Sequence, residues 1–130
     1  TAPSRFVVSG GTPFFTAASA GGTPQPITQG PVVFDTTRGG RMVMFGTGVL
    51  ETETDANSVA VQSIYSVWDK DADTIPRPMG RTVLAPRTVS AVSGAGGATF
   101  YSVAGADVNW TSERGWVMDL DVVAGLRLVY

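Results

Sequence analysis

The apolar positions of the chain fall into short runs that glycine and proline separate. With 16 glycines and 8 prolines among 130 residues, few windows are long enough for a helix. Short runs rich in valine and threonine between turn residues are typical of strands in a sandwich, barrel or propeller. The predicted strands cover 5–8, 13–17, 31–35, 41–46, 81–85, 88–92, 98–103, 115–120 and 126–130. This pattern predicts an all-β fold with helix in at most about 10% of residues.

The clearest turn joins the runs 31–35 and 41–46. Between them lies Thr36-Thr-Arg-Gly-Gly40, a glycine-containing five-residue loop of the kind that closes a β-hairpin. We therefore predict that these two strands pair with each other.

The stretch from 49 to 75 has neither glycine nor proline. Within it Val61, Ile64, Tyr65 and Trp68 have the i, i+3, i+4, i+7 spacing of an amphipathic helix. The neighbouring residues are mainly β-branched, aromatic or serine, a mixture that favours a pleated strand. We predict a strand over 59–68 and keep a helix as the alternative.

Charged residues are few and balanced, which limits the partners. They make up 15% of the chain, with nine Lys and Arg against eleven Asp and Glu and a net charge of −2. Nucleic-acid binding needs clustered cations that displace counterions from phosphates, and these scattered charges do not supply them. No apolar stretch reaches the about 18 residues of a membrane-spanning helix. We expect neither a nucleic-acid partner nor a membrane span.

The two ends of the chain suggest a piece of something larger. The start, Thr1 to Ser4, lacks the features of a signal peptide. The end, 126–130, is a predicted strand that stops without a turn or a polar tail. We expect the chain to be a fragment of a larger domain.

The usual catalytic pairs have few candidates. The chain has no histidine and no cysteine, so the common nucleophile–base pairs and disulfides are excluded, and a Ser–Lys pair would need Lys70, the only lysine. Alternating carboxylates occur at Glu51, Glu53, Asp55, Asp119 and Asp121. On an extended segment such residues share one face and could form an acid–base pair. A solvated loop, or a strand edge that charged side chains protect from pairing with another strand, explains the same pattern. We therefore predict no catalytic residue.

Asp69, Asp71 and Asp73 have the 1-3-5 spacing of a calcium-binding loop. The EF-hand pattern also needs a glycine at the sixth position and a glutamate at the twelfth, where this chain has Thr74 and Gly80. We therefore predict a solvated turn that binds calcium weakly or not at all.

Gly46-Thr-Gly48 is the most conspicuous glycine pair near a predicted strand. A phosphate-binding turn opens a helix whose amides face the anion, whereas here Glu51 and further carboxylates follow and would repel it. We predict that these glycines let a strand bend or pass close to another backbone.

The three tryptophans lie in two kinds of context. Trp68 and Trp116 are in strand-like runs and are predicted to be core residues. Trp110 lies in a polar loop and is the candidate for stacking on a sugar or a partner. Asn109-Trp-Thr111 is a glycosylation acceptor only in a eukaryotic secreted protein.

A family resemblance spans nearly the whole chain. Its motifs are Pro13-Phe-Phe-Thr-Ala17, Gln25-Pro-Ile-Thr28, Phe45-Gly-Thr-Gly48, Glu51-Thr52, Gln62-Ser-Ile-Tyr-Ser-Val-Trp-Asp69, Arg114-Gly-Trp-Val-Met-Asp-Leu120 and Gly125-Leu-Arg-Leu-Val129. In this order they resemble the C-terminal domain of the PilY/PilC family, large surface proteins of bacterial type IV pili. The run from Phe45 to Asp69 is the most specific part.

The resemblance implies that residues 1–130 form a single fragment of a modified β-propeller, with antiparallel sheets that make two or three blades. It implies a non-enzymatic role in pilus biogenesis and surface adhesion, with pilus components or host and surface receptors as partners. The location would be the bacterial cell surface, pilus-associated, or the periplasm and outer membrane. The calcium loop of the family lies before the matched segment, so no metal, cofactor or catalytic residue is carried over, and the binding residues stay unknown.

Two other classes of function stay open at this point. Quinone-dependent dehydrogenases are also propellers with aspartate turns, although this chain lacks recognisable cofactor-stacking tryptophans and cationic ligands. A carbohydrate-binding β-domain would use Trp110.

Excised blades are expected to associate with each other. They leave in water the apolar faces that the complete ring covers, here including 6–8 and 126–130. Burying about 400 Å² of apolar surface contributes on the order of 10 kcal/mol, against association costs of about 4–15 kcal/mol. We predict that the fragment dimerises or exchanges a strand at high concentration.

Overall fold

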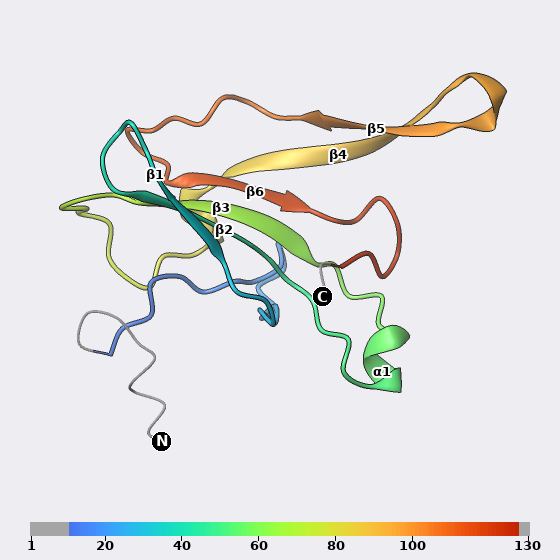
Figure 1. Cartoon of the computed structure of the whole chain (residues 1–130), viewed down its shortest axis with the longest axis horizontal. Helices are drawn as coiled ribbons and strands as arrows, with labels where there is room; N and C mark the ends of the chain where they lie inside the picture. Colours follow the sequence, from blue (N-terminus) through green and yellow to red (C-terminus); the bar gives the residue numbers. More distant parts are fainter. Residues whose placement is uncertain (1–10, 128–130) are drawn as a thin grey trace.

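The computed structural model describes residues 11–127, which form one six-stranded sheet in the order β1-β2-β3-β6-β4-β5 (Figure 1). The strands are β1 (Val32–Asp35), β2 (Arg41–Gly46), β3 (Ser63–Asp69), β4 (Ala85–Ser93), β5 (Thr99–Ala104) and β6 (Gly115–Asp119). The helical elements of the described part are short: α1 (Glu53–Ala56) and the 3-10 turns η2 (Arg81–Val83) and η3 (Ala95–Gly97). The predicted all-β fold is confirmed.

The pairing of neighbouring strands is mostly antiparallel. The pairs β1–β2, β2–β3, β3–β6 and β4–β5 all run antiparallel, as expected. The contact of β4 with β6 is parallel, with Ala85 opposite Trp116, and makes the sheet a mixed one. A parallel contact needs a long crossover connection, and the whole β5 strand with its flanking loops supplies it.

Three predicted strands on the β1–β2–β3 side agree well with the structure. β2 has the predicted bounds, and β1 pairs with it across the Thr36–Gly40 loop. The strand predicted over 59–68 is confirmed for 63–68, within β3 between β2 and β6, whereas residues 59–62 are not in a strand. Both faces of β3 are covered, since Tyr65 and Val67 on one face and Ser66 and Trp68 on the other are all buried. A strand covered on both faces shows no simple alternation, which explains its helix-like spacing of apolar residues.

Two predicted strands are wrong. Residues 81–85 begin with η2, and only Ala85 belongs to a strand. Residues 13–17 form no strand but a single bridge, Phe15 to Met79, and a second one lies just beyond, Ala18 to Pro24. The predicted strand 5–8 lies outside the described residues. So does the end of 126–130, whose described part, Leu126 and Arg127, is not in a strand.

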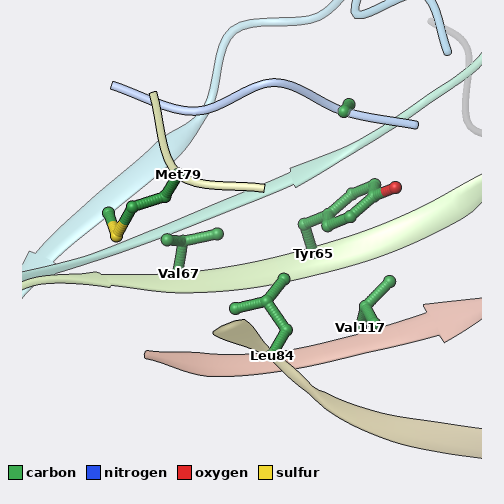
Figure 2. Close-up of a cluster of buried hydrophobic side chains, with 6 residues drawn as sticks. Tyr65, Val67, Met79, Leu84 and Val117 are labelled. Atoms are coloured by element: carbon green, nitrogen blue, oxygen red, sulfur yellow. The ribbon is translucent and has the colours of Figure 1, made fainter. Parts of the chain in front are cut away.

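The core lies between the sheet and two segments that cover one of its faces, residues 14–17 and the segment around Met79. Its buried members are Ala17, Tyr65, Val67, Met79, Leu84 and Val117 (Figure 2). Phe15 packs edge-on against the ring of Tyr65 at 5.3 Å, and Phe45 stacks on it at 5.1 Å. Backbone bonds between Phe14 and Met79 and between Thr16 and Met79 hold the two covering segments together. The aromatic cluster therefore fixes the loop 11–27 on β2 and β3.

Gly115 lets β6 approach β3. Its φ is +127°, and a Cβ atom there would lie 1.9 Å from the carbonyl oxygen of Ser66. Only glycine fits both the backbone conformation and the space. The β3–β6 pairing therefore depends on this residue.

The outer strands of the sheet are exposed. Every residue of β1 and of β5 is exposed, including Val33, Phe34, Phe100 and Tyr101. Within residues 11–127, no helix has the length and apolar character to cross a bilayer.

Candidate functional site

A chain of polar side chains runs from the loop 11–30 through β3 to β6. The Tyr65 hydroxyl lies 2.7 Å from the Ala18 carbonyl oxygen and 2.5 Å from Gln25 Oε1, and can donate to either. Gln25 Nε2 donates to Ser63 Oγ at 2.9 Å, and Ser63 Oγ donates to Asp119 Oδ1 at 2.6 Å. We call Tyr65, Gln25, Ser63, Asp119 and Arg81 the polar chain.

Arg81 and Asp119 end the polar chain as a bidentate ion pair. The guanidinium donates to Oδ1 at 2.8 Å and to Oδ2 at 2.6 Å. Burial raises the pKa of Asp119, but the hydrogen bonds from Arg81 and Ser63 outweigh it, so that the pKa lies below its usual value. The hydrogen bond to Asp119 also raises the pKa of Arg81. Asp119 therefore stays ionised and cannot act as a general acid near neutral pH.

A pocket of about 410 Å³ opens beside the polar chain. Gln25, Asp119 and the second predicted carboxylate, Asp121, all line it, together with Gln62. The buried Gln62 Oε1 has no hydrogen-bond partner within the described part of the chain. Asp119 and Asp121, considered above as a possible acid–base pair, thus line one pocket, but Arg81 already neutralises Asp119. The pocket offers polar contacts, and Asp119 faces it as an ionised hydrogen-bond acceptor.

The prediction of an extended segment at Glu51, Glu53 and Asp55 is wrong, because Glu53 and Asp55 belong to the helix α1. Thr52 is its N-cap: the Thr52 hydroxyl accepts from the Asp55 amide at 3.2 Å, and Asp55 Oδ2 accepts from the Thr52 amide at 2.9 Å. The Thr52 hydroxyl also donates to Asp55 Oδ2 at 2.9 Å, and this hydrogen bond is the main reason that the pKa of Asp55 lies below its usual value. The acidic alternation is therefore a helix cap, and the spacing of Thr52 and Asp55 was a readable signal for it.

The loop 69–73 is held by ion pairs and is not a purely solvated turn. Arg114 Nε and Nη2 donate to the two carboxylate oxygens of Asp73 at 2.8 Å each, with side chains only 3% and 6% exposed. This hydrogen bonding lowers the pKa of Asp73 to about 2. Asp69 pairs with Arg77 at 2.5 Å. Asp71 is exposed, and residues 11–127 contain no group of three or more acidic or other ligating residues that could hold a metal ion.

The tryptophans near this loop pack together. Trp68 is buried, as predicted, and donates from Nε1 to the Gly39 carbonyl oxygen at 2.7 Å. Trp110 meets its ring edge-on at 5.7 Å, and the guanidinium of Arg38 lies over the Trp110 ring at 5.0 Å. Trp110 and Trp116 are both half-buried. The ring proposed for sugar stacking therefore has one face already in contact with a cation.

The turn Gly46-Thr-Gly48 is structural. The buried Thr47 hydroxyl accepts from the Ser63 amide at 2.8 Å, and the Gly48 amide donates to the Pro26 carbonyl oxygen at 2.9 Å. Gly48 also forms a parallel bridge with Ile27. The prediction that these glycines bring a strand close to another backbone is confirmed.

Comparison with known proteins identifies the class first. The crystal structure of the Pseudomonas aeruginosa PilY1 C-terminal domain superposes with a TM-score of 0.67 at 28% identity, covering 85% of this chain and 26% of that domain. The family model described as PilY1 beta-propeller domain matches residues 1–84. The sheet with its covering loops is therefore part of a β-propeller, as the sequence motifs implied.

Curated relatives agree with this assignment. Type IV pilus biogenesis factor PilY1 from Pseudomonas aeruginosa is 32% identical in an alignment 146 residues long, which covers 95% of this chain and 12% of the relative. The PilY1 homolog of Xylella fastidiosa is 29% identical over 110 residues, covering 85% of this chain and 7% of the relative. The chain belongs to the PilY1 family of type IV pilus biogenesis factors.

Proposed function

We propose that the chain is part of a non-enzymatic module that acts in type IV pilus biogenesis and in surface adhesion. The observation that carries this proposal is the match to PilY1 over 95% of the chain. The chain spans only 12% and 7% of the length of these curated relatives, so the function is proposed for the longer protein that contains it. In it, residues 1–130 belong to one propeller domain, which acts at the cell surface, on the pilus, or in the periplasm and outer membrane.

The charges of the candidate site support a binding role over a catalytic one. Asp69, Asp73 and Asp119 are each held by an arginine, which stabilises loops and strand ends. The pairing keeps Asp73 and Asp119 ionised, because it lowers the pKa of each. Because these carboxylates are already engaged by arginines, we expect partners to be recognised by exposed loops and strands instead. Pilus components and host or surface receptors are the partners that we propose for them.

The full-length factor, expressed in its own bacterium after deletion of the gene, tests this role. Asp73→Ala removes the buried partner of Arg114 and is expected to reduce surface pili and adhesion, because it destabilises the module. The exposed neighbour Asp71→Ala is the matched control and is expected to keep wild-type levels. Sheared surface pilin and attached cells are measured, with the amount of factor checked by immunoblot.

Two results would contradict the proposal. Normal piliation and adhesion after deletion of residues 1–130 would show that this module is dispensable for both. Quinone-dependent dye reduction by the purified full-length protein would favour the dehydrogenase alternative and overturn the non-enzymatic role.

We also propose that this chain has no tight calcium site of its own. Calcium binding at the loop 69–73 would have to compete with Arg77 for Asp69 and with Arg114 for Asp73. Calorimetry with the 130-residue chain is expected to show no binding in the micromolar range. Micromolar binding that Asp71→Ala abolishes would contradict this prediction.

A further inference from the structure

The long connection between β2 and β3, which carries α1, is held by few apolar contacts. We call its residues 49–60 the α1 loop. Neither α1 nor any other part of this loop has a buried residue, and only Val49, Asp55 and Ser58 are half-buried. A segment with so little apolar burial opens at a low free-energy cost unless polar contacts hold it.

One guanidinium binds the carbonyl oxygens of these same three residues. Arg127 Nη1 donates to the Val49 carbonyl oxygen at 3.1 Å and also to that of Asp55, and Nη2 donates to that of Ser58 at 2.8 Å. Arg127 Nε donates to the Gly125 carbonyl oxygen at 3.0 Å, which fixes the side chain on its own segment. All three guanidinium nitrogens are therefore engaged, and each bond to the loop has a charged donor.

The contact joins two segments that are far apart in the sequence. The segment after β6 turns back and ends near the connection that carries α1 (Figure 1). Arg127 and Asp55 are 72 positions apart. Within the described part of the chain, Arg127 is the one side chain from outside residues 47–62 that hydrogen-bonds to the α1 loop. The last carbonyl oxygens of a helix lack partners within it, so a cation is favourable at that end of α1.

Gly125 allows the two segments to approach closely. Its φ is +77°, and a Cβ atom there would lie 3.1 Å from the Ser58 carbonyl oxygen, which Arg127 also binds. A side chain at this position would strain the backbone and push the segment away from the loop. The α1 loop and residues 121–127 are therefore fitted to each other at this contact.

We propose that Arg127 is a latch that couples the segment after β6 to the α1 loop. When residues 121–127 lie in place, the guanidinium gathers the three carbonyl oxygens and the loop is ordered. When this segment is displaced, the loop loses its charged hydrogen bonds and opens as one unit while the sheet stays folded. Order and disorder of a segment that depend on a few charged contacts are a known form of conformational switch.

A glutamate-specific protease reads the state of the loop. The chain has three glutamates: Glu51 and Glu53 in the α1 loop, and Glu113 just before β6. Cleavage of a folded protein needs local opening, so the rate at each site reports how often that segment opens. In the 130-residue chain, Arg127→Gln is expected to raise cleavage at Glu51 and Glu53 at least about tenfold, because hydrogen bonds to a charged group are lost. Cleavage at Glu113 is expected to stay at the wild-type rate.

A second pair of variants moves the segment and keeps the guanidinium. Gly125→Ala is expected to raise cleavage in the α1 loop severalfold, because the added methyl group displaces residues 121–127. Gly22→Ala is its matched control, since Gly22 has a φ of +85° but no atom within 4 Å of the added Cβ. It brings similar backbone strain and is expected to leave the loop protected. Arg41→Gln, which breaks an exposed ion pair with Asp35, is the control for Arg127→Gln and is expected to cleave as wild type.

Any of three outcomes rules the latch out. Equal cleavage of the α1 loop in wild type and Arg127→Gln would show that the guanidinium does not hold it. Faster cleavage at all three glutamates together would show that Arg127 stabilises the whole fold, and circular dichroism of each variant checks this independently. The third outcome concerns the full-length factor, where peptide mapping locates the cuts. An α1 loop that stays protected there after Arg127→Gln would show that another part of the protein holds it.

Discussion

Asp73→Ala is expected to lower the free energy of unfolding by about 3–5 kcal/mol, the usual cost of removing one partner of a buried ion pair. The Arg114 side chain is 3% exposed, and without Asp73 its charge stays buried, with the Glu113 carbonyl oxygen as its one remaining hydrogen-bond acceptor among residues 11–127. Urea unfolding of the 130-residue chain at neutral pH measures the change.

Two further variants separate the ion pair from other effects. Asp71→Ala changes an exposed carboxylate two residues away and is expected to cost less than about 0.5 kcal/mol. Asp73→Ala combined with Arg114→Met removes both charges and is expected to recover part of the loss. A double variant less stable than Asp73→Ala alone would show that Arg114 acts by packing.

The same pair makes stability depend on acid. The pKa of Asp73 is about 2 in the folded chain, against 3.8 as its ordinary value. Because the folded pKa is the lower one, the pair stabilises the protein above about pH 4, and this contribution is lost as the pH falls toward 2. It amounts to about 2 kcal/mol, less than the cost of Asp73→Ala, since a protonated carboxyl group still hydrogen-bonds. Between pH 6 and pH 2 the wild-type chain should lose this contribution to its free energy of unfolding. The Asp73→Ala variant should show no corresponding loss, and unfolding curves of both measure the difference.

Tyr65→Ala is the second change with a large expected effect, again about 3–5 kcal/mol of unfolding free energy. The Tyr65 side chain is fully buried between Phe15 and Phe45, so that its removal leaves a cavity in the core. Tyr65→Phe keeps the ring but leaves Gln25 Oε1 without the hydroxyl, which should cost about 1–3 kcal/mol. Urea unfolding measures both.

Tyr101→Ala is the matched control for Tyr65. Tyr101 is 56% exposed, and at concentrations where the chain is monomeric its loss is expected to change stability by no more than about 0.5 kcal/mol. Equal effects of Tyr65→Phe and Tyr65→Ala would contradict the separate roles of ring and hydroxyl.

Strands bounded by clear turn residues could be predicted from the sequence. β2 and its hairpin with β1 are local, because the Thr36–Gly40 loop both separates and joins them. Residues 81–85 were misassigned because Val83 and Leu84 are apolar in any conformation. The turn η2 there brings Arg81 to Asp119, a contact across 38 residues that no local pattern contains.

The candidate site was predictable only in parts. Asp119 and Asp121 were identified as neighbours, and they do line one pocket. Asp73 was identified as a member of an acidic loop, but its partner Arg114 lies 41 residues away in the sequence. The family motifs contain Gln25, Ser63 and Tyr65 without indicating that these side chains touch. Only the folded backbone brings them together.

The position of β6 has a consequence for the order of folding. Among the strands of residues 11–127, β6 is the last to be synthesised, yet it lies between β3 and β4. The hairpins β1–β2–β3 and β4–β5 can form from nearby residues, whereas β6 must reach back so that Asp119 pairs with Ser63. Such distant pairings form slowly, and chains emerge from the ribosome N-terminus first. Until Asp119 has emerged, we expect β1–β2–β3 and β4–β5 to be two separate half-sheets, with the backbone groups of β3 that later pair with β6 still in contact with water.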